Sequence, residues 1–158
     1  EVFMCIRSLI LFGMVFNILF STNSWSVDDQ ERAQVAVDTR QGLLKVIGYY
    51  IGPMVGMARG QIDYDADLVA ANAEKMGKLT AMIPDLFKMD TSGSGVASDS
   101  LNGIWDNSED FNNKAAAASQ RAFELADAAK EGKTAFMQAF GATGGACKSC
   151  HDDYRKKQ

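Results

Sequence analysis

The residues best suited to chemistry lie together near the C-terminus, where the sequence reads Cys147-Lys148-Ser149-Cys150-His151. Residues three apart share one face of a helix, so both thiols would point the same way, and the histidine follows the second thiol directly. This C-x-x-C-H pattern is the attachment signature of a c-type haem. Two thiols can reach the two vinyl groups of one porphyrin, and the next side chain then meets the iron. We therefore predict one covalent haem c on Cys147 and Cys150, with His151 as the iron ligand.

Three other interpretations of the cysteine pair have to be weighed. A C-x-x-C pair also forms the centre of disulfide oxidoreductases, but there it usually opens a helix after a strand. Half of a zinc site is the second alternative, although no second cysteine pair exists and the chain has one histidine. A structural disulfide is the third, and it would not need the adjacent histidine. The spacing and the histidine together favour haem.

The histidine count limits the iron chemistry. His151 is the only histidine in the chain, so a haem with two histidine ligands from one chain is excluded. The second axial position must take a methionine or a less usual ligand, or stay open. With this histidine on the iron, none is left as a distal acid–base group for cleaving a peroxide bond. We therefore expect no enzymatic activity, and a peroxidase is the least favoured function.

Four stretches with helical periodicity must position the motif, at about residues 28–58, 65–83, 108–129 and 133–154. In the first stretch, Leu44, Ile47 and Ile51 recur with the three-and-four spacing of an amphipathic helix. Residues 90–107 are expected to be loop by composition, apart from the apolar pair Ile104-Trp105. No stretch shows the period-two alternation of a half-buried strand. The sequence predicts an all-α antiparallel four-helix bundle, with the haem motif near the end of its last helix.

The N-terminal segment is interpreted separately from this bundle. Residues 9–20 form an apolar run of about 12 residues, with Arg7 before it and small polar residues after it. This run is shorter than the roughly 18–20 residues that span a bilayer as a helix. A basic start, a short apolar centre and a small-residue end are typical of a secretory signal peptide. We expect a signal peptide over 1–26, a haem domain over 27–158 and a periplasmic location; an uncleaved membrane anchor is the alternative.

The net charge of the protein indicates which kinds of macromolecule it can bind. The formal net charge is −4 at pH 7. It stays the same without residues 1–26, because that segment contains one acid and one base. A mildly acidic domain lacks the basic surface that nucleic acids require, so no nucleic-acid partner is expected.

On these motifs, residues 30–158 resemble the class II cytochromes c, which comprise the cytochrome c′ group and its low-spin relatives of the c556 type. The resemblance rests on Arg40-Gln41-Gly42-Leu43-Leu44, Gly52-Pro53-Met54, Ile104-Trp105, Ala139-Phe140-Gly141 and the run from Ala146 to Arg155. A haem motif at the C-terminal end of four helices is specific, since most other c-type cytochromes carry it near the N-terminus. Cytochrome c′ is itself a standard example of a four-helix bundle.

The resemblance implies roles for four further residues. It places Arg40 and Gln41 at the haem propionates and Arg155 in the proximal pocket. It also implies that the first helix covers the distal face of the haem, with Leu44 directed at the iron. Low-spin members have a methionine at this position, whereas cytochromes c′ usually have leucine or another residue that is not a ligand. Met54 cannot replace it, because it lies about 15 Å further along an unbroken helix.

A leucine has no lone pair to offer the iron, so we expect a five-coordinate haem with an apolar distal pocket. Without a distal hydrogen-bond donor, bound O₂ gains little stabilisation, whereas NO and CO depend less on such a donor. We predict a periplasmic haem protein that binds NO and CO and exchanges single electrons with redox partner proteins. The alternative is a low-spin electron carrier of the c556 type. Family members often form homodimers through the first two helices, for which Tyr49, Tyr50 and Ile51 are candidates here unless they are ordinary core.

Overall fold

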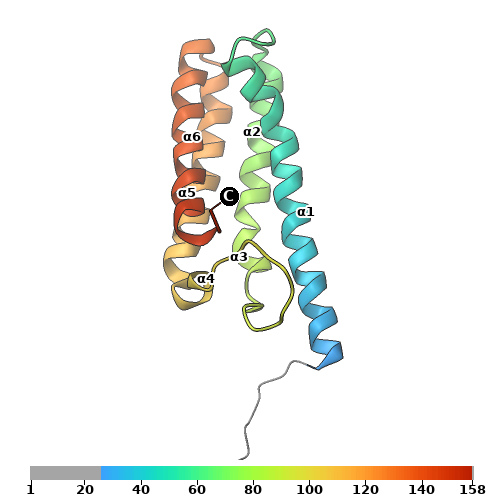
Figure 1. The fold of residues 1–158 in the computed structure, drawn as a ribbon. Helices are drawn as coiled ribbons and strands as arrows, with labels where there is room; N and C mark the ends of the chain where they lie inside the picture. Colours follow the sequence, from blue (N-terminus) through green and yellow to red (C-terminus); the bar gives the residue numbers. More distant parts are fainter. Residues whose placement is uncertain (1–25, 158) are drawn as a thin grey trace, which may run out of the picture.

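The computed structural model describes residues 26–157, so the predicted signal peptide lies, apart from Ser26, outside the described residues (Figure 1). Within 26–157 the chain forms six helices: α1 (Val27–Ala58), α2 (Ala66–Ala81), α3 (Ile83–Leu86), α4 (Gly103–Asp106), α5 (Ser108–Ala129) and α6 (Lys133–Tyr154). The same residues contain no strand, only an isolated bridge between Ser100 and Arg155. None of the described helices is both long and apolar enough to cross a membrane. The predicted all-α four-helix bundle is confirmed.

The helix ends follow from local sequence. The Ser26 hydroxyl accepts a hydrogen bond from the backbone N–H of Asp29 at 3.2 Å and so caps α1. The Asp65 carboxylate accepts one from the N–H of Leu68 at 2.9 Å and so caps α2. Between α5 and α6, Gly132 has a φ of +111°, a conformation that favours glycine. The helix starts predicted at about residues 65 and 133 are therefore confirmed.

The predicted loop over 90–107 contains one short helix, at the apolar pair that the prediction excepted. The pair Ile104-Trp105 lies within the short helix α4, and Ile104 is buried. The Trp105 indole N–H donates to the carbonyl of Phe87 at 2.8 Å. The apolar pair therefore folds onto the bundle, and its packing orders a turn that the polar composition around it does not predict.

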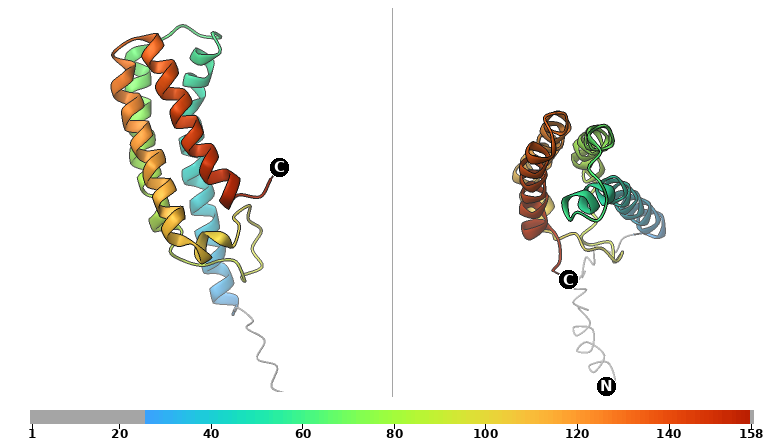
Figure 2. Two further views of the ribbon diagram at one scale, coloured as in Figure 1. Left: turned by 90° about the vertical axis from the view of Figure 1, so that its left-hand side faces the viewer. Right: turned by 90° about the horizontal axis from the view of Figure 1, so that it is seen from above.

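The four long helices contact one another unevenly. The most extensive packing joins α2 to α5 and α5 to α6, while α1 packs chiefly on α2. Between α1 and α6 the described residues make no comparable contact. The end-on view shows α1 and α6 as the two outer helices of this arrangement (Figure 2). The space between them is therefore bordered by α1 on one side and by α6 on the other.

The inner helices α2 and α5 approach each other closely at Gly77. A Cβ atom placed on Gly77 would lie 2.7 Å from the ring of Phe123, which is too close for a real contact. The Ser119 hydroxyl donates to the Gly77 carbonyl at 2.8 Å at the same level. The absence of a side chain at Gly77 therefore sets the spacing of α2 and α5 here.

The buried apolar residues form two separate clusters. The upper cluster lies toward the α5–α6 connection at the top of Figure 1 and consists of Met54, Met57, Val69, Ala73, Met76, Ala122, Leu125, Ala129 and Phe136. The lower cluster lies toward α3 and α4 and consists of Ile104, Phe111 and Tyr154, with Ile83, Phe87, Trp105 and Cys150 packed against it. The bundle is thus closed by apolar packing at both levels, and the haem motif begins between them.

Candidate haem site

The predicted attachment residues Cys147 and Cys150 lie on one face of α6. Phe136, Thr143 and Tyr154 are buried on this face. Cys147 and Cys150 continue the same three-and-four spacing between Thr143 and Tyr154, and both are half-buried. Both cysteines are free thiols. The two sulfur-bearing side chains therefore share one face of α6, as the attachment of a single porphyrin requires.

The electrostatics of the two thiols disfavour a centre for disulfide exchange. Burial raises the pKa of Cys147 above its ordinary value, and burial is also the main cause that raises the pKa of Cys150 to about 11. Reactive cysteines in disulfide oxidoreductases have lowered pKa values, because the thiolate is the nucleophile. Moreover, no group of three or more His, Cys, Asp or Glu side chains within residues 26–157 could hold a metal ion.

His151 follows Cys150 directly and is exposed at the surface of α6. Desolvation by the surrounding protein lowers the pKa of His151, the charge of Arg155 lowers it further, and Asp152 opposes both. The imidazole is therefore neutral at pH 7, which is the form that binds iron. Arg155 itself is half-buried, and its backbone N–H donates to the carbonyl of His151 at 3.1 Å. The proximal role that the family resemblance assigns to Arg155 stays a prediction.

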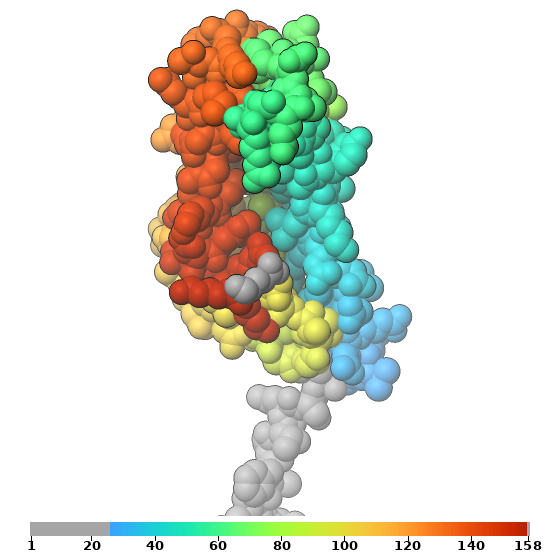
Figure 3. Space-filling model, turned by 45° about the horizontal axis from the view of Figure 1, so that its top comes forward, coloured from blue at the N-terminus to red at the C-terminus, as the bar shows by residue number. Residues whose placement is uncertain are grey.

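The opposite wall of the site is α1. Its inward stripe consists of the buried residues Ala33, Val37, Arg40, Met54 and Met57. Leu44 falls on this stripe by its spacing from Arg40, yet 41% of it is exposed. A hollow separates the surfaces of α1 and α6 at mid-height (Figure 3). The inward stripe of α1 is therefore interrupted by an exposed residue between the upper and lower clusters.

The residues around this hollow fit a covalently attached haem. Two free thiols on one helix face match the two vinyl groups, and the neutral imidazole of His151 is a suitable iron ligand. Leu44 supplies an apolar side chain without a donor atom on the other wall. The thiols and the imidazole on α6 and the hollow between α1 and α6 therefore both fit a bound haem.

Arg40 makes contacts that sequence reasoning missed. It is 3% exposed, and its Nε donates to the carbonyl of Leu86 at 2.8 Å. Its Nη1 donates to the Thr91 hydroxyl at 2.8 Å, and its Nη2 donates to the carbonyl of Met89 at 2.6 Å. The guanidinium also lies 4.6 Å from the centre of the Phe87 ring. Arg40 therefore joins α1 to the segment that follows α3.

The predicted role of Arg40 and Gln41 at the propionates is compatible with these contacts. A guanidinium has five N–H donors, and the three bonds above leave two of them for a carboxylate. Gln41 is exposed beside Arg40 on the same helix. Burial lowers the pKa of Arg40, and the nearby Asp90 carboxylate opposes this shift. The propionate role of both residues stays a prediction.

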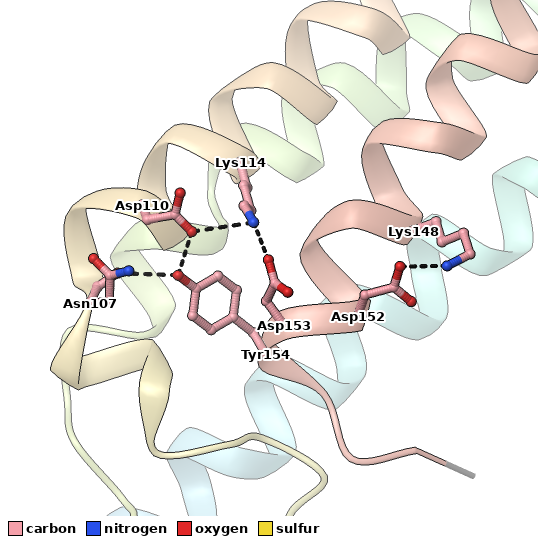
Figure 4. A network of polar contacts seen from close by, with 7 residues as sticks. All are labelled: Asn107, Asp110, Lys114, Lys148, Asp152, Asp153 and Tyr154. Atoms are coloured by element: carbon pink, nitrogen blue, oxygen red, sulfur yellow. Dashed lines mark hydrogen bonds and ion pairs between the residues drawn. The ribbon is translucent and has the colours of Figure 1, made fainter.

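A polar network fastens the last turn of α6 to α5 (Figure 4). The Tyr154 hydroxyl donates to Asp110 Oδ2 at 2.5 Å. The Lys114 ammonium lies 3.3 Å from the same Asp110 oxygen and also pairs with Asp153. The hydrogen bond to Asp110 is the main cause that raises the pKa of Tyr154 to about 12, and the same bond lowers the pKa of Asp110. The sequence held no signal for this network beyond the spacing of Asp110 and Lys114.

The backbone that follows α6 is also held. The N–H of Leu101 donates to the carbonyl of Tyr154 at 3.0 Å, and the N–H of Lys156 donates to the carbonyl of Asp99 at 2.8 Å. The Lys156 ammonium donates to the carbonyl of Ser98 at 2.6 Å. The residues after α6 therefore lie alongside the loop that precedes α4, and the end of the motif-bearing helix is fixed on two sides.

A helical bundle with a C-x-x-C-H motif on its last helix defines the helical class of c-type cytochromes. Within that class, the sequence profile described as Cytochrome C′ matches residues 35–155, and the chain belongs to the cytochrome c′ family, whose proteins bind haem c. The family resemblance seen in the sequence is thereby confirmed.

Three relatives show how close the similarity is. A cytochrome c′ of Cereibacter sphaeroides is 34% identical over 128 residues, which are 80% of this chain and 86% of the relative. A cytochrome c-556 of Agrobacterium tumefaciens is 34% identical over 125 residues, which are 77% of this chain and 98% of the relative. A solved structure of a ferrous cytochrome c′ variant from Alcaligenes xylosoxidans with bound NO has a TM-score of 0.69 and 32% identity. That match covers 80% of this chain and 97% of the other.

Proposed function

We propose that this protein carries one haem c, attached through Cys147 and Cys150 and ligated by His151, and that its five-coordinate iron binds NO and CO in the periplasm. The observation that carries the proposal is Leu44, which lies on the inward stripe of α1 by its spacing, is 41% exposed and has no donor atom. The NO-bound relative from Alcaligenes xylosoxidans supports the choice of ligand.

In this proposal the two walls of the site, α6 and α1, have different roles. Cys147 and Cys150 would hold the macrocycle on α6, and the neutral His151 would bind the metal from that side. Leu44 would cover the other side and keep water from it. The haem, when bound, supplies a metal that takes up diatomic gases and exchanges single electrons with redox partner proteins. We expect no enzymatic turnover, since the only histidine would be committed to the iron.

The polarity of the pocket favours NO and CO over O₂. Bound O₂ needs a distal hydrogen-bond donor more than NO or CO does. The strong donor nearest to Leu44 along the inward stripe is Arg40, and its guanidinium is bonded to Leu86, Met89 and Thr91. The apolar side chain of Leu44 therefore sets the preference.

A low-spin electron carrier is the second candidate, and the similarity to cytochrome c-556 from Agrobacterium tumefaciens supports it. Such a carrier would need a sixth iron ligand, for which methionine is the usual choice. Met54 and Met57, the methionines on α1, are both fully buried in the upper cluster, and α1 runs without a break through this region. Either residue would have to leave the core to act as a ligand, so the gas-binding function is favoured.

The visible spectrum of the purified, haem-loaded protein tests the proposal. A five-coordinate ferrous protein should show broad high-spin bands that sharpen when CO or NO is added. Sharp α and β bands before any gas is added, without a response to CO, would reject gas binding and favour the low-spin carrier. The mass of the intact protein reports separately whether one haem is covalently bound and whether the chain is cut near Ser26.

The periplasmic location and a homodimer belong to the same proposal. Of the three candidate dimer contacts, Tyr49 is 76% exposed, whereas Tyr50 and Ile51 pack against the upper cluster. Only Tyr49 is therefore free to meet a second copy through its side chain. Cell fractionation tests the location, and the molar mass in solution, compared between the natural protein and Tyr49→Ala, tests the dimer.

A further inference from the structure

The polar network at the end of α6 points to a role that haem attachment alone does not explain. We propose that Tyr154 is a positioning residue for His151: its hydrogen bond to Asp110 fixes the rotation of the last turn of α6 and thereby the direction of the imidazole. The inference rests on the proposed haem attachment at Cys147 and Cys150. It does not depend on whether the iron has five or six ligands.

Tyr154 is placed to control this rotation. It follows Cys150 by four residues and His151 by three, so it shares a helix face with the second thiol. Its ring is buried in the lower cluster, edge-on to Phe111 with ring centres 5.3 Å apart, and Cys150 packs against the same cluster. A rotation of the last turn would withdraw the ring from this cluster and break the bond to Asp110.

The acceptor of the hydrogen bond is itself held in place. Asp110 and Lys114 stand one turn apart on α5, with the Lys114 ammonium 3.3 Å from Asp110 Oδ2. The same ammonium pairs with Asp153 on α6 and lies 5.6 Å from the centre of the Tyr154 ring. The phenol is therefore bonded to a carboxylate that α5 orients, which gives the bond a fixed direction.

The contribution of the phenol can be separated from that of the backbone. The bonds from Leu101 to the Tyr154 carbonyl and from Lys156 to Asp99 use main-chain atoms only. They remain in Tyr154→Phe, which keeps the ring and removes the hydroxyl. This variant leaves the charge of the site unchanged.

The experiment compares the haem-loaded natural protein with Tyr154→Phe. The first readout is hydrogen exchange of the amides from 151 to 155, which we expect to become faster by about tenfold, the factor for losing one hydrogen bond to a charged group. The second readout is the pattern of hyperfine-shifted haem methyl resonances in the proton NMR spectrum of the ferric protein. This pattern depends on the orientation of the axial imidazole, and we expect it to change.

Two further variants make the test specific. Asp152→Asn changes the charge beside His151, but Asp152 is exposed and pairs only with Lys148 of its own helix, so its amide exchange should match the natural protein (Figure 4). Asp110→Ala removes the acceptor of this bond, together with the pair to Lys114, and should shift both readouts in the same direction as Tyr154→Phe. The effect of the double variant should be smaller than the sum of the two single effects, because both variants remove the bond from Tyr154 to Asp110.

The proposal is overturned if Tyr154→Phe leaves both the amide exchange and the methyl pattern unchanged. If Tyr154→Phe does not accumulate with haem, Asp110→Ala gives the same two readouts with the tyrosine ring in place, and unchanged values there overturn the proposal equally. A failure of the proposed haem attachment is distinguishable. It would appear in the natural protein as a mass without haem, before any variant is compared.

Discussion

The two helices that border the site are held in different ways. The wall formed by α6 packs along α5, and its last turn is tied down by the Tyr154 side chain and by the backbone after it. The wall formed by α1 packs chiefly on α2, and Arg40 joins it to the end of α3 and to the segment after it. The predicted iron ligand therefore lies on the fixed wall, and Leu44 lies on the more open one. In the proposed function, this difference separates a side that holds the cofactor from a side that admits a ligand.

The largest effect should come from the fixed wall, by replacing Cys147 and Cys150 with alanine together. Without thiols no thioether can form, so we expect complete loss of covalently bound haem. Mass spectrometry of the denatured protein and the visible spectrum measure this loss. Each single alanine variant, with one thiol left, serves as the control. A double variant that still carries covalent haem would contradict the assignment of the site.

The second prediction concerns the attachment of the open wall. Arg40→Ala leaves the carbonyls of Leu86 and Met89 and the hydroxyl of Thr91 without this donor. We expect the free energy of unfolding to fall by at least about 3 kcal/mol, because each of these three acceptors costs about 1 kcal/mol or more when it loses its partner. Denaturation by urea measures the change.

Arg121→Ala is the matched control for Arg40→Ala. Arg121 is exposed and pairs with Glu124 of the same helix at 2.6 Å, and such surface pairs contribute less than about 1 kcal/mol. Equal losses in the two variants would show that Arg40 does not hold the open wall.

The third prediction concerns a variant that places a second iron ligand on the open wall. Leu44→Met places a thioether on the inward stripe, and we expect a low-spin haem with at least about tenfold weaker CO binding, or about 1.4 kcal/mol. Visible spectra and CO titrations provide the measurement. Val46→Met is the control, because Val46 is exposed and lies two residues away, on the opposite side of α1. If Leu44→Met kept a high-spin spectrum, Leu44 would not face the iron.

The smallest effect is expected on the pH dependence of the free energy of unfolding. It tests how much the bond between Tyr154 and Asp110 stabilises the fixed wall. The pKa of Tyr154 is raised to about 12, so the folded protein binds the phenol proton more tightly than the unfolded chain, whose tyrosines titrate near pH 10. The resulting stabilisation is complete below about pH 10 and is lost as the pH rises toward about 12. Urea denaturation across this range should show a steeper decline for the natural protein than for Tyr154→Phe.

Tyr64 does not disturb this comparison. Burial raises the pKa of Tyr64 as well, but that residue is present in both proteins, so its contribution cancels in the difference. Parallel curves for the natural protein and Tyr154→Phe would show that the bond to Asp110 contributes no pH-dependent stability.

Local features of the fold were predictable, whereas the contacts that hold the walls were not. The helix cap at Asp65, the break at Gly132 and the shared face of Cys147 and Cys150 depend on residues within one or two helical turns, so sequence rules apply to them. The partners of Arg40 lie 46 to 51 residues away and include main-chain carbonyls, which leave no mark in a sequence pattern. The bond from Tyr154 to Asp110 likewise spans 44 residues.

Gly77 lies in the core, away from the haem motif, yet its missing side chain bears on the size of the site. α1 packs on α2 and α6 packs on α5, so the distance between α2 and α5 influences the distance between the outer helices α1 and α6. A methyl group at position 77 would meet the ring of Phe123, so either the ring would have to turn away or the inner pair would have to move apart. If the inner pair moved apart, the outer pair would follow, so a glycine far from the motif in the sequence helps to set the space between α1 and α6.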